Sequence, residues 1–378
     1  MVNPSTDTPA RVAFVLHVMQ VAGAEVLVVE TIRRLGARIA PTVFCLDAVG
    51  PLGEQLRAEG VPVLAFDRKP GLDWSVFGRM AHEIRERQID VVHAHQYTPF
   101  FYASIAARLA RTRARLIFTE HGRHFPDVVS PKRRLANRLV FDRLANDITA
   151  VCEWSARSLA EKDGFTASRI RVIPNGIDIA RYERREGRED TRRRLGLDPG
   201  RRYVVIVARF HPVKDHATLI AGFKAVADTR PDVDLLLVGD GPLRPEIERQ
   251  VAGLGLTGRV SLVGVQSNVN EWLLASDIFA LSSVSEAASI TLLEAMACGL
   301  PAVVTAVGGN PELVRDGIDG VLVPRADSAG FSAAFLRLLD SPDLARSMGQ
   351  SGAARVRQEF LMETTVTRYA ALYAQGRR

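Results

Sequence analysis

Cysteine and long apolar runs are both scarce in this chain. Its three cysteines, Cys45, Cys152 and Cys298, are far apart in 378 residues, which fits neither a disulfide framework nor the paired ligands of a zinc site. Such usage is typical of a reducing cytoplasm. The most apolar early stretch, residues 12–21, is too short and too interrupted for a membrane span or a signal peptide. We therefore expect a cytoplasmic protein, either soluble or peripheral on the inner face of the membrane.

Motifs that would identify several other protein classes are also missing. Gly239 and Gly241 follow an apolar run, but Arg244 stands where the dinucleotide-binding G-x-G-x-x-G motif needs its third glycine. Asp232 and Asp234 form a D-x-D pair, yet we expect this pair before its strand, at the sheet edge opposite to the one that binds ligands. No nucleic-acid motif or aromatic interleaving accompanies the basic residues. We therefore predict no metal, no cofactor and no nucleic-acid partner.

The positive charge of the chain is concentrated in its first half. The net charge is +6, and the first 180 residues hold 24 Lys and Arg against 19 Asp and Glu, whereas residues 181–378 hold 25 against 24. This excess favours an anionic partner for the first half, either a membrane surface or an acidic acceptor. An arginine-rich, solvated surface explains the same numbers.

Residues 132–144 form a basic amphipathic pattern. Cations and apolar residues alternate there at helical spacing: Lys132, Arg133, Arg134, Arg138 and Arg143 with Leu135, Leu139, Val140 and Leu144. One interpretation is a surface helix that packs its apolar stripe on the core. The other is a helix that contacts anionic lipid headgroups.

Apolar strands alternate with helical patterns along most of the chain. Strands are predicted at residues 11–18, 91–95, 115–119 and 203–209. Runs that are apolar throughout indicate strands buried on both faces of a parallel sheet. We predict an α/β protein of two Rossmann-like domains, with the charged residues 182–194 as the linker.

Histidines stand at the ends of two predicted strands, where α/β sheets bind ligands. His93 and His95 end one strand, and His121 follows the next. Three roles remain open for His93 and His95: metal ligands, contacts with an acceptor, or structural histidines. We expect strand alternation to turn their two rings to opposite faces of the sheet, which disfavours a metal.

The most informative stretch covers residues 285–314. Glu286 and Glu294 are separated by seven residues, and Ser289 between them is the predicted N-cap of a helix. The amides of a helix start attract phosphate, and ionised carboxylates accept hydrogen bonds from hydroxyls. The Gly-Gly turn at Gly308 is expected to bring backbone N–H groups close to a ligand. Taken singly, the two glutamates also fit ordinary loop and helix surfaces, but together these features suit a nucleotide-sugar.

The E-x7-E spacing, followed by EAMACGLP and GGNPEL, resembles the retaining glycosyltransferases of family 4, which have the GT-B fold. The resemblance covers nearly the whole chain and includes an I-P-N-G-I-D segment at residues 173–178. It implies an acceptor-binding domain over residues 1–180 and a donor-binding domain over residues 195–355, facing each other across a cleft. It also implies that a terminal helix, about residues 356–378, crosses back to the first domain.

The resemblance assigns roles to several residues. Arg209 and Lys214 would bind the donor diphosphate and replace a metal, Glu294 would bind the ribose, and Glu286 and His121 would lie beside the sugar. The rest of the implied donor site consists of backbone groups at Gly23, Gly264, Val265, Ser289, Ile290 and Thr291. An ordinary βα turn explains Gly23 equally well. Glu286 is followed by Ala287-Ala288 where the family has Gly-Phe, so we expect a sugar pocket of different shape.

The predicted function is the transfer of a sugar, with retention, from a nucleotide-diphosphate sugar to a sugar or lipid-linked acceptor. Such an enzyme would serve cell-surface polysaccharide or glycolipid synthesis. Two alternatives remain: an epimerase or hydrolase of the same fold, and a non-catalytic module that binds nucleotide-sugars. The joint presence of two cations and two glutamates argues against the module.

Overall fold

The computed structural model describes residues 8–122, 129–183 and 186–376, and its internal contacts divide the chain into two compact units. Residues 8–122, 129–175 and 363–376 form the first unit, and residues 176–183 and 186–362 form the second. The last helix, α16 (Met362–Ala374), belongs almost entirely to the first unit. The prediction that the terminal helix returns to the first domain is therefore confirmed.

The first unit is built on a seven-stranded sheet in which all strands are parallel. Its strand order is β3-β2-β1-β4-β5-β6-β7. The bounds are β1 Ala10–Val18, β2 Ile39–Ala48, β3 Val63–Ala65, β4 Val91–His95, β5 Arg115–Glu120, β6 Asp147–Ala150 and β7 Ile170–Val172. The central strands are buried on both faces, as their apolar runs predicted.

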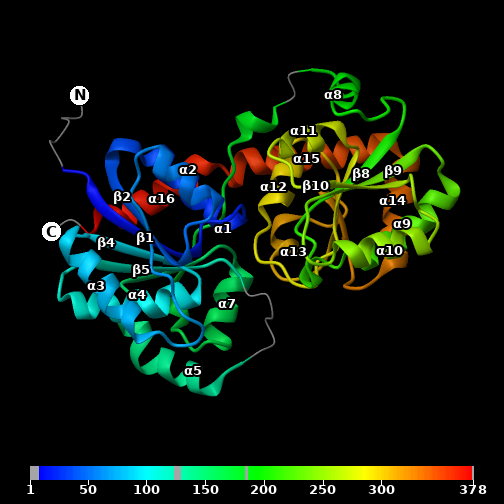
Figure 1. The fold of residues 1–378 in the computed structure, drawn as a ribbon. Helices are drawn as coiled ribbons and strands as arrows, with labels where there is room; N and C mark the ends of the chain where they lie inside the picture. Colours follow the sequence, from blue (N-terminus) through cyan, green and yellow to red (C-terminus); the bar gives the residue numbers. More distant parts are fainter. Residues whose placement is uncertain (1–7, 123–128, 184–185, 377–378) are drawn as a thin grey trace. The chain divides into compact units, whose positions relative to one another are not determined.

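Helices cover both faces of this sheet (Figure 1). One face carries α1 (Gly23–Leu35), α2 (Pro51–Ala58) and α16, and the other carries α3 (Trp74–Glu86), α4 (Tyr97–Ala110) and α7 (Glu153–Glu161). Between β5 and β6 lie α5 (Pro131–Ala136), a π-helical stretch (Asn137–Phe141) and α6 (Asp142–Leu144). Short 3-10 turns occur at Gly36–Arg38 and Ala167–Arg169.

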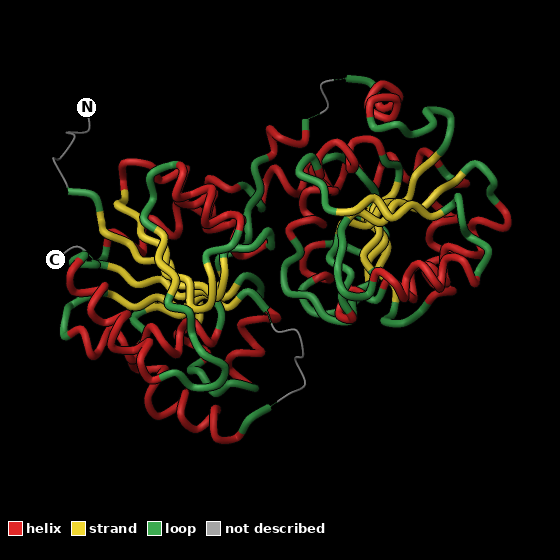
Figure 2. Tube along the Cα trace, in the orientation of Figure 1, coloured by secondary structure: helices red, strands yellow, loops and turns green. Residues whose placement is uncertain are grey.

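The second unit has a six-stranded sheet, again parallel throughout, in the order β10-β9-β8-β11-β12-β13. Figure 2 shows these strands gathered at the centre of the unit with helices around them. The strands are β8 Arg202–Val207, β9 Val233–Val238, β10 Val260–Gly264, β11 Ile278–Leu281, β12 Ala302–Thr305 and β13 Gly320–Val323. The helices are α8 Arg188–Arg194, α9 His216–Thr229, α10 Arg244–Gly253, α11 Val269–Ala275, α12 Ile290–Ala297, α13 Asn310–Leu313, α14 Ser328–Asp340 and α15 Pro342–Glu359, with 3-10 turns η4 at Ile179–Tyr182 and η5 at Pro212–Lys214.

The prediction that residues 182–194 form the linker between the two domains is wrong. The chain passes from the first unit to the second between Asn175 and Gly176. Within the charged segment, Arg192 is buried in the second unit, where its guanidinium donates to the Ala275 carbonyl at 2.8 Å and to Asp277 at 2.6 Å. A buried and paired arginine fixes helix α8 to its domain, so charge alone did not identify a flexible segment.

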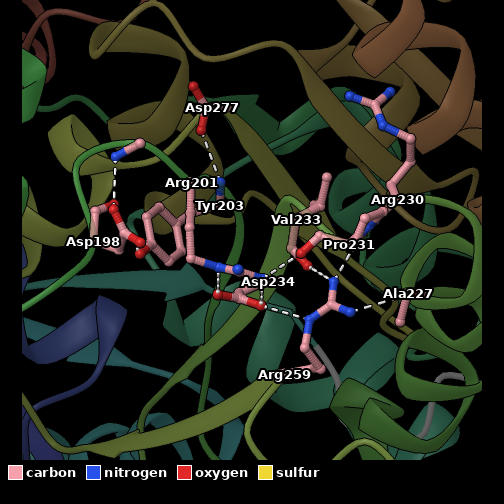
Figure 3. A network of polar contacts seen from close by, with 11 residues as sticks. Asp198, Arg201, Tyr203, Ala227, Arg230, Pro231, Val233, Asp234, Arg259 and Asp277 are labelled. Carbon is pink, nitrogen blue, oxygen red and sulfur yellow. Dashed lines mark hydrogen bonds and ion pairs between the residues drawn. The ribbon is translucent and has the colours of Figure 1, made fainter.

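The D-x-D pair has a structural role in the second unit. Asp234 lies inside β9 and accepts hydrogen bonds from Arg201 at 2.7 Å and Arg259 at 2.8 Å (Figure 3). Asp232 pairs with Arg230 at 3.0 Å. Arg201 and Arg259 also donate to the backbone carbonyls of Pro231 and Arg230, just before β9, so the paired carboxylates tie the neighbouring loops to the strand.

Candidate functional site

The stretch that begins at Ser285 folds as predicted around the start of α12. Ser289 is extended, with φ −66° and ψ 117°, and its hydroxyl accepts from the Leu292 amide at 3.4 Å. The hydroxyls of Ser289 and Thr291 are 3.2 Å apart. The helix ends before Gly299, which adopts a positive φ of 74°. The two predicted glutamates therefore lie before this helix and in its second turn.

Lys214 and Glu286 are in direct contact in the second unit. Lys214 ends η5, shortly after β8, and its ammonium donates to Oε1 of Glu286. The Ser283 hydroxyl donates to the same carboxylate oxygen at 2.6 Å. The lysine side chain is 23% exposed and the glutamate side chain 10%. A cation and a carboxylate that were predicted for adjacent parts of one ligand thus meet in a partly buried pair.

The Gly-Gly turn performs a different task from the one predicted. Gly308 has φ +56°, and a Cβ built on it would lie 1.7 Å from the Glu286 carbonyl oxygen. The Gly309 amide donates to that carbonyl at 3.2 Å. The turn therefore holds the backbone of Glu286, and the prediction that its N–H groups approach a ligand is wrong for Gly309.

Glu294 has a partner that the sequence did not indicate. The hydroxyl of Tyr182, at the end of η4, donates to Oε1 of Glu294 at 2.5 Å. Burial raises the pKa of Glu294 to about 7, while the Tyr182 hydrogen bond and the charge of Arg181 lower it. Tyr182 was assigned to the linker, and its separation of 112 residues from Glu294 gave no local signal.

The remaining predicted residues of the second unit lie after strands or at the start of α12. Arg209 follows β8 and is exposed, and within the described part of the chain no hydrogen bond or ion pair joins it to the Lys214–Glu286 pair. Gly264 ends β10 with φ +82° and accepts from the Gly239 amide at 2.8 Å. The Val265 side chain after it is 71% exposed. Ile290 opens α12 and is half-buried.

A buried histidine cluster lies in the first unit, at the ends of β4 and β5. The rings of His93 and His95 are 4.1 Å apart, so the expectation that they face opposite sides of the sheet is wrong. Residues two apart in a strand share a face. His93 bonds to the Tyr373 hydroxyl of α16 at 2.8 Å and to the Thr119 hydroxyl at 2.7 Å. This histidine is therefore a satisfied structural residue that anchors the terminal helix.

His121, the predicted sugar contact, is tied to the same cluster. Its Nε2 lies 2.8 Å from Nδ1 of His95, and His121 itself is half-buried. Burial lowers the pKa of His93 to about 3 and of His121 to about 4, and holds that of His95 well below its usual value. The rings are thus neutral at pH 7 and donate or accept hydrogen bonds without carrying charge.

Glu120, which precedes His121, and the predicted Gly23 are two further residues of the first unit. Burial raises the pKa of Glu120 to about 8, so this carboxyl is mainly protonated at neutral pH, and it accepts from the Gly122 amide at 2.9 Å. Gly23 begins α1 as an exposed residue after Ala22, which caps the helix without a side-chain hydrogen bond.

Two parallel-sheet domains, with a lysine and two glutamates around one helix start in the second, define a GT-B protein. The fold is similar to that of Anabaena Alr3699/HepE, solved in complex with UDP and glucose. The TM-score is 0.85 at 23% identity, and the match covers 96% of this chain and 99% of that one.

Sequence comparisons place the chain in a family. Residues 21–181 match the model of Glycosyltransferase Family 4, and residues 187–355 match that of Glycosyl transferases group 1. An N-acetyl-alpha-D-glucosaminyl L-malate synthase of Bacillus anthracis is 29% identical over 80% of this chain and 79% of its own length. A lipopolysaccharide core biosynthesis mannosyltransferase, LpsB of Rhizobium meliloti, is 30% identical over 76% of this chain and 80% of its own. The chain belongs to the group 1/family 4 glycosyltransferases, and it transfers a sugar from a donor to an acceptor.

Proposed function

We propose that this glycosyltransferase uses a nucleotide-diphosphate sugar, retains the anomeric configuration and needs no metal. The observation that carries the proposal is the contact between Lys214 and Glu286 beside the capped start of α12. A cation and free helix amides suit a diphosphate, and a carboxylate suits sugar hydroxyls. Arg209, at the end of β8, supplies a second cation for the diphosphate, and His121 a neutral imidazole for the sugar.

The proposed reaction proceeds on one face of the sugar. The bond between the anomeric carbon and the diphosphate oxygen breaks, and the acceptor oxygen forms its new bond from the same side. The acceptor proton passes to the departing diphosphate. Lys214 leaves Glu286 for the developing negative charge, which frees the carboxylate to face the positive charge on the sugar. Interactions that strengthen in this way act on the transition state more than on bound substrate.

The donor and the acceptor follow from the relatives as proposals. The HepE structure holds UDP and glucose, so a UDP-sugar is the first donor to test. LpsB acts in lipopolysaccharide core synthesis, which favours a lipid-linked acceptor and a role in cell-surface glycan or glycolipid synthesis. Synthesis of this kind would place the enzyme in the cytoplasm, at the inner face of the membrane.

Thermal unfolding with UDP, GDP and ADP tests the donor. A ligand at about 100 times its dissociation constant adds about 2.7 kcal/mol to the free energy of unfolding. We expect a clear rise with one of the three, and the same rise in the presence of EDTA. The anomeric configuration of the product, followed by NMR, tests retention. Inversion, or activity that EDTA abolishes and Mn²⁺ or Mg²⁺ restores, would contradict the mechanism.

One surface of the first unit supports a membrane contact. Leu135, Leu139 and Val140 do not pack on the core but are 59%, 54% and 48% exposed. They belong to α5, which is labelled in Figure 1, and to the π-helical stretch after it. The inner side of this segment is instead filled by Asn137 and Phe141. Exposed cations surround the apolar residues: Lys132, Arg134, Arg138 and Arg143. Among the described residues no helix has both the length and the apolar character to cross a bilayer. An amphipathic segment with cations around its apolar residues suits binding at the lipid surface.

Charge reversal tests the membrane contact. Arg133 is unsuitable because it pairs with the buried Asp163 at 2.7 Å, so the test uses Arg134→Glu with Arg138→Glu. Each cation near an anionic surface contributes about 1 kcal/mol, and we expect vesicle binding to weaken at least about tenfold. The control reverses Arg346 and Arg357, two exposed residues of α15 in the second unit. Equal losses in both double variants, or binding that salt does not weaken, would contradict the proposal.

A further inference from the structure

The contact between Tyr182 and Glu294 joins the chain entry of the second unit to its donor-site helix. Tyr182 is 9% exposed, and its hydroxyl donates to Oε1 of Glu294 at 2.5 Å. Hydrogen bonds to an ionised acceptor are shorter and stronger than bonds between neutral groups. This geometry therefore favours the carboxylate over the protonated acid and fixes the orientation of its plane.

The described charged and titratable groups around Glu294 come from η4, from α11 and from the end of α12. The turn η4 contributes Tyr182 and Arg181, and the charge of Arg181 favours the ionised form. Cys298 follows the last residue of α12 and interacts electrostatically with Tyr182. On the neighbouring α11, Glu271 is engaged by Arg194 at 2.6 Å and by Asn268 at 2.7 Å. Among the residues that the structure describes, Tyr182 is thus the hydrogen-bond donor that favours the ionised Glu294 carboxyl, whereas burial disfavours it.

We propose that Tyr182 is a positioning residue of the donor site. Its hydroxyl occupies Oε1 of Glu294 and leaves Oε2 to the ribose hydroxyls, so that the glutamate meets the nucleotide as an oriented carboxylate. This inference rests on the proposed function, because it assumes that Glu294 binds the ribose. Tyr182 itself touches no reacting atom, and it acts only through Glu294.

One consequence is that the hydroxyl of Tyr182 determines the pH range over which the donor binds tightly. Without its hydroxyl, the pKa of Glu294 rises further, because a bond to the ionised form is lost while burial remains. The carboxyl is then protonated at neutral pH and accepts ribose hydroxyls less well. The lost affinity should return at high pH, where the carboxyl ionises in both proteins.

The test substitutes Tyr182→Phe, which removes one oxygen and keeps the ring. UDP binding is measured by calorimetry between pH 6 and pH 9, together with kcat and donor KM. We expect binding about tenfold weaker at pH 6 to 7 and close to native at pH 9, with kcat at saturating donor little changed. Infrared spectra should show the C=O band of the protonated Glu294 carboxyl persisting to higher pH, assigned by its absence in Glu294→Gln.

Tyr203→Phe is the matched control. Tyr203 is buried in the same unit, and its hydroxyl donates to the Asp198 carbonyl at 3.1 Å, so this variant loses a similar bond elsewhere. Native UDP binding by Tyr182→Phe at pH 7, or a loss that is equal at every pH, would overturn the role of Tyr182. Native UDP binding by Glu294→Gln would instead overturn the proposed ribose contact. The two failures are distinguishable, because UDP binding by Glu294→Gln stays weak if only the role of Tyr182 is wrong and is native if the ribose contact is wrong.

Discussion

Removal of the Lys214 charge should cost stability that a second substitution restores. In Lys214→Met the carboxylate of Glu286 loses its cation and keeps only the Ser283 hydroxyl among its described partners. Breaking a fully buried ion pair in this way costs about 3–5 kcal/mol. Because the two side chains are 23% and 10% exposed, we expect a smaller loss of about 2 kcal/mol.

The double variant Lys214→Met/Glu286→Gln leaves no unpaired charge, so at least half of that loss should return. The coupling energy would then be about 1–2 kcal/mol, within the range for residues in contact. For a unit of this size, a loss of about 2 kcal/mol lowers the midpoint of thermal unfolding by about 4–8 °C. Turnover should not return with stability, because loss of a preorganised cation at a leaving group costs about 10²–10³ in rate.

Lys224→Met provides the control for this cycle. Lys224 pairs with Asp228 one turn along α9, and the two side chains are 35% and 57% exposed. Such surface pairs contribute about 0.3–0.5 kcal/mol. Additive losses in the double variant, or near-native turnover in Lys214→Met, would refute the reasoning.

Two further predictions concern Glu294 and the histidine cluster. Glu294→Gln should raise the donor KM with less effect on kcat, since a ribose contact does not change during reaction; steady-state kinetics with varied donor would show the reverse pattern if Glu294 faces the sugar. Between about pH 4.5 and 6.5 the unfolded chain protonates His93, His95 and His121, which stay neutral when folded, whereas Glu120 is protonated only in the folded unit. Below about pH 5.5, where the unfolded histidines are mostly protonated, the net difference is about two protons and should lower the free energy of unfolding by about 2.7 kcal/mol for each further pH unit. Thermal melts between about pH 5.5 and 4.5 that show no such slope would contradict it.

The features that the sequence predicted are those determined by local pattern. Apolar runs placed the buried strands, and Ser289 marked the start of α12 through a cap that involves only its neighbours in the chain. A helix cap and a continuous apolar run can both be read from residues that are neighbours in the chain, so the structures that they predict were found in the fold. The resemblance to a known family then supplied the pairing of the two domains, which no local pattern contains.

The features that were missed depend on partners distant in the sequence. Arg192 is buried because its guanidinium pairs with the carboxylate of Asp277, 85 residues away. The charged composition of its own segment had instead predicted an exposed linker. Tyr182 meets Glu294 across 112 residues. Gly308 fits closely against the backbone carbonyl of Glu286, a contact that the sequence did not indicate. In each case the local composition was compatible with several structures, and tertiary contacts selected one.

The return of α16 to the first unit has a consequence for how the protein is made. The ring of Tyr373 packs edge-on against Phe14 at 6.0 Å, so nearly the whole chain separates two neighbours in one core. At about 5–20 residues per second, a ribosome needs roughly 10–40 s to synthesise the second unit that lies between the parts of the first. During that interval the sheet that began the chain lacks its last helix, and Phe14 and His93 lack their final cover. The domain that is synthesised first is therefore the one that is completed last.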